Sequence, residues 1–160
     1  MRSPTSKYYF HKWRNDQGGA LVEFAIVMPL LLLLCFGIIE FGLVLYNKAV
    51  LTNASREGAR VGIHYDSSTG EYTPLSTIQN AILAYCEDRL IPKTNQLLAE
   101  DINVSWNGSS TKPSVSSTGL PLTITIDYDY NFFAFSGIIS LFGGSIKSIS
   151  LGAETVMLLE

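Results

Sequence analysis

The chain has 160 residues, a formal net charge of −3 and a hydrophobic content of 47%. This length suits one compact domain with an anchor and is too short for two domains of ordinary size. The small negative charge gives no support to nucleic-acid binding by the whole molecule. The two cysteines, Cys35 and Cys86, show no metal-ligand spacing. A disulfide between them is not expected, because Cys35 lies inside a long apolar run.

Residues 1–18 form a basic segment in front of that apolar run. Its charged side chains are four bases and one acid: Arg2, Lys7, Lys12, Arg14 and Asp16. Positively charged flanks stay on the cytoplasmic side of a membrane. The segment is therefore predicted to be a cytoplasmic leader, with everything after Tyr46 outside.

Residues 24–46 are apolar almost throughout, and Glu40 is the only acidic or basic side chain among them. As a helix they measure roughly 34 Å, enough to cross a hydrocarbon core of about 30 Å. A buried core helix would carry a polar stripe instead. A removable secretory signal has a shorter apolar region, of about 7–15 residues. The run is therefore predicted to be a retained transmembrane helix within a long helix over residues 19–62, because no helix breaker appears before about Gly62.

A candidate cleavage motif stands directly before the apolar run. Gly18 is followed at a fixed spacing by Glu23 and the aromatic Phe24. Glycine exposes the backbone to a protease without a side chain in the way. The motif favours cleavage in front of the span. The spacing alone leaves a second interpretation open, in which the glycines are a flexible joint and Glu23 is the polar edge of the helix.

Several blocks in chain order resemble the TadE-like proteins, which are minor pilins or pseudopilins of the tight-adherence (Flp) pilus and relatives of type IV pilins. The first block runs from Gly19-Ala20-Leu21-Val22-Glu23-Phe24 through residues 34 and 37–42, and further similarity lies in residues 54–60, 122–130 and 153–160. The resemblance implies that a prepilin peptidase cuts after Gly18. Gly19 would then be the first mature residue and Glu23 the fifth.

The resemblance also implies a function. The expected role is structural and non-catalytic: a subunit that assembles into, or primes, a tight-adherence type IV pilus used in cell adhesion and related to secretion pseudopilins. The expected partners are inner-membrane lipid, the prepilin peptidase, other minor and major pilins and the assembly platform. The expected location is the bacterial inner membrane, with a periplasmic or extracellular C-terminal domain, and then the pilus. The alternative is a single-pass anchored binding or sensor module outside the cytoplasm.

Three polar or helix-breaking residues lie along the span. Glu23 and Glu40 are separated by about 25 Å of helix, near opposite boundaries of the core, where a carboxylate costs least. The resemblance implies that Glu23 pairs with the freed amine of Gly19, and snorkelling is the alternative. For Glu40, snorkelling and docking to a partner remain equally open. Pro29 denies a hydrogen bond to the carbonyl of Ala25, which predicts a kink or local melting on assembly.

Small residues recur beyond the span at Ala54, Gly58 and Gly62. Their spacing of four places them on one helix face, where a sheet or another helix can approach closely. Ordinary helix packing is the simpler interpretation. Arg56 and Arg60 form a separate pair, expected to be solvated or to lie near lipid head groups.

Residues 63–160 are predicted to form an exported domain. Thr73-Pro74 suits the start of a helix, and Ile91-Pro92 suits its end. Alternating apolar and polar residues then predict three strands, over residues 102–107, 122–130 and 149–157. Such alternation predicts an antiparallel sheet with one buried face. The expected fold class is α+β and pilin-like, with a long N-terminal transmembrane helix packed against a small antiparallel sheet and one additional helix.

No catalytic, cofactor or metal site is predicted. His11 and His64 are isolated, and no phosphate loop or nucleophile motif occurs. Asp127 and Asp129 share a strand face, for which solvation is the favoured interpretation over a bound cation. Residues 132–142 are apolar but too short to span a membrane. They are expected to cover the core or, alternatively, to form an exposed contact patch.

Overall fold

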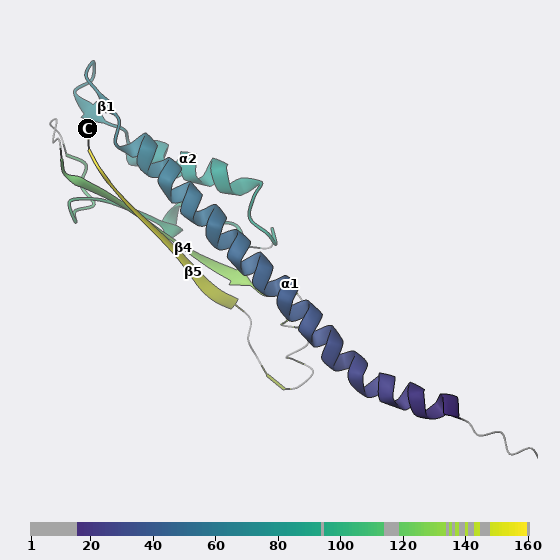
Figure 1. Cartoon of the computed structure of the whole chain (residues 1–160). Helices are drawn as coiled ribbons and strands as arrows, with labels where there is room; N and C mark the ends of the chain where they lie inside the picture. The colour runs from purple at the N-terminus through teal and green to yellow at the C-terminus, as the bar shows by residue number, and fades with distance from the viewer. Residues whose placement is uncertain are drawn as a thin grey trace, which may run out of the picture. The chain divides into compact units, whose positions relative to one another are not determined.

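The computed structural model describes residues 16–93, 95–113, 119–133, 135, 137, 140, 143–144 and 148–159 (Figure 1). The elements in chain order are α1 (Asp16–Gly62), β1 (Tyr65–Asp66), β2 (Glu71–Tyr72), α2 (Leu75–Glu87), the 3-10 turn η1 (Ala99–Asp101), β3 (Ile102–Trp106), β4 (Pro121–Asn131) and β5 (Ser148–Leu158). These elements confirm the predicted α+β class. The chain divides into an N-terminal unit, residues 1–35, and a C-terminal unit, residues 36–160.

The described part of the N-terminal unit is helical from Asp16, three residues before the predicted start. Its large apolar side chains are exposed throughout, from Leu21 to Leu34. Within the described residues, α1 is long and apolar enough to cross a membrane. The first 15 residues of the predicted leader lie outside the described residues.

The C-terminal unit is built on a three-stranded antiparallel sheet in the order β3-β4-β5. In β4, alternate side chains from Leu122 to Tyr130 are buried, as the period of two predicts. The register pairs Ile102 with Ile126 on one side of β4, and Ala153 with Ile126 on the other. The strands therefore present one continuous apolar face.

Both helices cover that apolar face of the sheet. A Cβ added at Gly58 of α1 would meet Ile82 of α2 and Ile124 of β4, so the three elements converge there (Figure 1). The fully buried apolar side chains come from each of them: Leu51, Ala54 and Ala59 of α1, Ile78 and Ile82 of α2, and Leu122, Ile124 and Ile126 of β4. The core of the C-terminal unit thus lies between the sheet and the helix pair.

The ends of α2 differ from their prediction. Pro74 is the N-cap and not the first helical residue, and Thr73 makes no cap bond to α2. The Thr73 hydroxyl instead donates to the carbonyl of Val61, 2.9 Å away, near the end of α1. At its other end α2 stops at Glu87, before Ile91-Pro92, because two successive amides donate to the Cys86 carbonyl and tighten the last turn.

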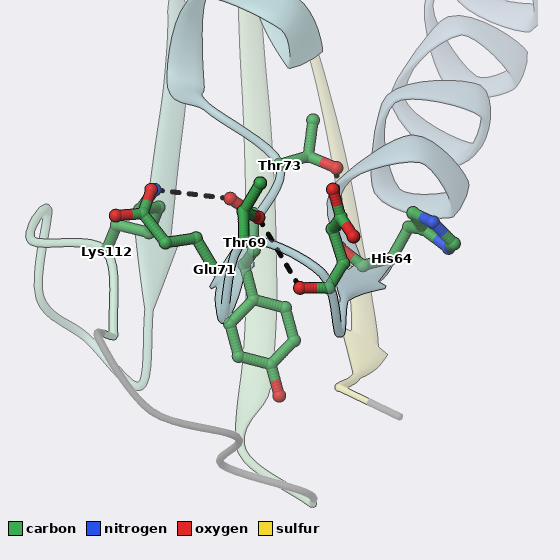
Figure 2. A network of polar contacts seen from close by, with 7 residues as sticks. His64, Thr69, Glu71, Thr73 and Lys112 are labelled. Atoms are coloured by element: carbon green, nitrogen blue, oxygen red, sulfur yellow. Dashed lines mark hydrogen bonds and ion pairs between the residues drawn. The ribbon is translucent and has the colours of Figure 1, made fainter.

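A short hairpin, β1–β2, joins the two helices and was not predicted. The rings of Tyr65 and Tyr72 meet edge to face, with centroids 5.1 Å apart. Lys112 reaches the hairpin from the loop after β3, with its Nζ 2.6 Å from Glu71 Oε2 (Figure 2). The Lys112 ion pair thus joins the hairpin to the loop after β3, and the Thr73 bond joins it to the end of α1.

Candidate functional site

The predicted cleavage motif lies in the first turns of α1. Gly18 and Gly19 are helical, and among the described residues no group outside the backbone of their own helix turn lies within 4 Å of a Cβ placed on either. Glu23 and Phe24 are exposed one turn further along. Glycine weakens a helix by about 1 kcal/mol relative to alanine. Two adjacent glycines therefore make this turn easy to unwind, as a protease that binds extended backbone requires.

Pro29 lies inside α1 without interrupting it, since the helix is continuous from Asp16 to Gly62. The predicted kink or melting concerns assembly and stays a prediction. Proline in an apolar helix leaves the carbonyl four residues before it without its usual donor. In a membrane such groups find other donors, for example in neighbouring helices.

Glu40 is the buried acidic side chain of α1, with only 3% of its surface exposed. Its Oε1 accepts hydrogen bonds from the Tyr130 hydroxyl at 2.7 Å and from the Phe133 amide at 2.8 Å. Burial, and then the hydrogen bond to Glu40, raise the pKa of Tyr130, so the hydroxyl stays a donor. The structure thus places Glu40 inside the C-terminal unit, where it joins α1 to the end of β4.

The predicted small-residue face of α1 lies against the core. Ala54 is fully buried. A Cβ at Gly58 would lie 2.5 Å from two atoms of Ile82, and one at Gly62 would lie 2.6 Å from Leu122 Cδ2. Real Cβ atoms do not approach carbon so closely, so glycine is required for α2 and the sheet to pack at this distance. The face is used within the C-terminal unit.

The sequence analysis missed two buried polar residues of α1, Asn47 and Ser55. Asn47 Oδ1 accepts from the Ile91 amide at 3.0 Å, and its Nδ2 donates to the Ile91 carbonyl. The Ser55 hydroxyl lies 2.7 Å from that of Thr155 in β5. With Glu40, these residues occupy the same face as the glycines, so α1 is joined to the domain by polar contacts at several levels.

Asn47→Leu is expected to destabilise the C-terminal unit by about 1–3 kcal/mol, because both backbone groups of Ile91 lose their partner at a partly buried contact. The free energy of unfolding in detergent measures the effect. Asn53→Leu is the matched control, since Asn53 is an exposed residue of the same helix. Equal stabilities of the two variants would contradict the role given to Asn47.

The basic residues beyond the span lie on the exposed side of α1. Arg60 Nη2 lies 2.7 Å from Glu57 Oε1, and this hydrogen bond lowers the pKa of the Glu57 carboxyl. Lys48 Nζ donates to the carbonyl of Gly152 in β5. Arg56 is exposed. These exposed cations make the helix surface basic just beyond the apolar residues 24–46.

An open cavity of about 380 Å³ lies between α2 and the segment that follows it. Its lining combines apolar side chains such as Leu83 and Leu97 with the polar Asn80, Glu87 and Lys93. Among the described residues no group of three His, Cys, Asp or Glu side chains is arranged to hold a metal ion. Asp127 and Asp129 are both exposed on the outer face of the sheet.

Cys86 borders this cavity, but its side chain is buried, and burial raises its pKa to about 11. At pH 8 only about one molecule in a thousand then carries the reactive thiolate. In detergent, a maleimide is therefore expected to leave Cys86 unmodified. Peptide mapping by mass spectrometry checks this, with labelling of both thiols in denaturant as the control. Rapid modification of Cys86 in the folded chain would contradict the structure.

Comparison with known proteins supports the prediction made from the sequence. The family model described as TadE-like protein matches residues 18–60. No curated protein and no solved structure matches the chain. The matched segment begins at Gly18, contains all three glutamates of the helix, Glu23, Glu40 and Glu57, and ends within the glycine face that packs on the core. The match confirms the predicted resemblance of residues 18–60 to the TadE-like family.

Proposed function

We propose that the protein is a minor pilin or pseudopilin of a tight-adherence type IV pilus. It is inserted into the inner membrane through α1, loses its leader to a prepilin peptidase, and then assembles into the pilus or primes its assembly. The observation that carries the proposal is the TadE-like match over residues 18–60, on a helix whose apolar side chains are exposed. Such a surface requires lipid or neighbouring helices to cover it.

Cleavage after Gly18 would create a charged amine at Gly19. Glu23 stands four residues further along the same helix, and residues four apart lie on one face. The amine can therefore pair with Glu23 of its own chain or of a neighbour. Two charges that pair lose less free energy in an apolar environment than two separate ones. In this proposal Glu23 sets the register in which subunits associate.

The C-terminal unit supports a structural role in the assembly. Its sheet and α2 pack on α1 through the glycine face and through Glu40, Asn47 and Ser55. Force applied to the anchor helix is thereby transmitted to the folded unit. The outer face of the sheet, with Val156 and Leu158 exposed, remains available for neighbours.

Gly18→Leu is expected to block processing and abolish surface pili in cells that lack the native gene. The variant chain should stay in the membrane at a normal amount, because its C-terminal unit is unchanged. Counting pili by electron microscopy, with immunoblotting of the membrane fraction, measures both effects. Gly42→Ala is the matched control, since Gly42 is a helical glycine with no other group within 4 Å of its added Cβ.

Normal pili with Gly18→Leu would contradict the proposal. The second candidate is an anchored binding module outside the cytoplasm, which the cavity beside α2 favours. A module of that kind would keep its leader and function without a peptidase. Normal piliation in the strain that lacks the native gene would favour the binding module over the pilin role.

A further inference from the structure

Three phenylalanines follow the end of β4: Phe132, Phe133 and Phe135. The ring of Phe132 lies edge to face on Tyr130, with centroids 5.7 Å apart, and 6.3 Å from the ring of Phe135. The Phe133 side chain is 76% exposed. We name these three residues the aromatic tip. The remaining apolar positions of residues 132–142 lie outside the described residues.

The aromatic tip meets α1 inside the predicted membrane span. The Phe133 amide donates to Glu40, and Phe135 Cε2 lies 3.9 Å from a Cβ placed on Gly37. Gly37 and Glu40 both belong to residues 24–46. The folded unit therefore makes contact with the helix before the apolar stretch has ended.

Tyr46 and Lys48 mark the level of the lipid head groups on this part of α1. Tyrosine and lysine are enriched where a helix leaves the hydrocarbon. Glu40 precedes Tyr46 by six residues, or about 9 Å of helix. The exposed apolar side chains next to Glu40, among them Ile39 and Phe41, continue the surface of the span at this depth.

We propose that the aromatic tip inserts into the outer leaflet beside α1 and that Phe133 contacts lipid acyl chains. This inference rests on the proposed membrane anchoring. The contacts favour lipid as the partner of the aromatic tip. The tip is attached to the turn of α1 that contains Glu40, and the exposed side chains of that turn, Ile39 and Phe41, belong to the surface of the span. A bilayer that surrounds Ile39 and Phe41 also reaches Phe133.

The same arrangement accounts for the burial of Glu40. A carboxylate about 9 Å below the head groups would face hydrocarbon if the folded unit began only after Tyr46. The Tyr130 hydroxyl and the Phe133 amide supply donors at that depth. The aromatic tip thus places apolar rings toward lipid and polar groups toward Glu40.

A fluorescent probe placed on the tip tests the proposal. The full chain with Cys35→Ala and Phe133→Cys is labelled with nitrobenzoxadiazole maleimide and reconstituted into phosphatidylcholine vesicles. The Phe133 backbone amide is kept, and the buried Cys86 remains unlabelled, which Cys35→Ala alone verifies. Leu31→Cys reports on the span, and Leu158→Cys, at a side chain that is 62% exposed on the outer face of the sheet, is the water-exposed control.

The expected result is that a doxyl-labelled lipid quenches the probe at position 133 by more than half, whereas iodide in the buffer does not. The probe at position 158 should show the reverse. Quenching by iodide at position 133 would overturn the inference, as would protection from both quenchers, which would place another protein chain over the tip. If the probe at position 31 is quenched by lipid and that at position 133 is not, the anchor stands and only this inference fails.

Discussion

Gly58→Leu is expected to destabilise the C-terminal unit by about 3 kcal/mol, because overpacking a dense core forces side chains and backbone apart. Even the first added carbon would lie 2.5 Å from Cγ1 and Cδ1 of Ile82 and 3.3 Å from Ile124 Cδ1. Both neighbours are fully buried. Chemical denaturation in detergent, followed by the fluorescence of the buried Trp106, measures the free energy of unfolding.

Gly42→Ala is the matched control for this prediction. In the described part of the chain, nothing beyond the adjacent helix backbone lies within 4 Å of its added Cβ, so the change should leave stability unchanged or raise it by up to about 1 kcal/mol through helix propensity. Gly58→Ala combined with Ile82→Ala should recover much of what Gly58→Ala loses, since Ile82 is the clashing partner. A fully stable Gly58→Leu chain would contradict the close packing of α1 on α2.

Glu40→Leu is expected to lower the free energy of unfolding of the C-terminal unit. The expected loss is about 1–3 kcal/mol for each of the two donors that lose their acceptor. The donors are the Tyr130 hydroxyl and the Phe133 amide. The end of β4 should then separate from α1, and exchange of the Phe133 amide hydrogen should accelerate. Denaturation and hydrogen exchange measure the two effects.

Glu40→Gln retains an acceptor oxygen and should lose less stability than Glu40→Leu. Glu57→Gln is the control at a partly exposed carboxylate of the same helix. Tyr130→Phe in the Glu40→Leu background should restore part of the loss, because it removes one donor that has no acceptor. A Glu40→Leu chain that keeps the native stability and the native exchange rate of the Phe133 amide would contradict the role of Glu40 in joining α1 to the end of β4.

The fold was predictable where one face of an element is buried and the other is solvated. The expected strand over residues 122–130 is β4, Pro121–Asn131, because its alternate apolar residues face the helices. The same pattern predicted both ends of β3 and of β5 to within one residue. The long helix was predictable from an apolar run too long for a core strand.

The elements that the sequence analysis missed depend on contacts between distant residues, with one exception. The β1–β2 hairpin has strands of two residues and is held by Lys112 and Thr73, which no local pattern identifies. The turn at Asn107-Gly108 did carry a local signal. Both residues have positive φ, and Asn-Gly is the preferred pair for such a tight turn.

The polar residues on the buried face of α1 show why the site was only partly predictable. Glu40, Asn47 and Ser55 share a face with Gly58, so helical periodicity alone could have placed them toward the domain. Their partners could not be predicted in the same way. Ile91 and Thr155 come from segments that reach α1 only after the chain has folded.

The most direct test of the proposed function is the N-terminal sequence of the membrane-extracted protein, determined with and without the prepilin peptidase. The account predicts a chain that begins at Gly19 when the peptidase is present and at Met1 when it is absent. The Gly18→Leu chain should begin at Met1 in both samples. A native chain that begins at Met1 regardless of the peptidase would contradict processing, and with it the proposal that this protein enters a pilus.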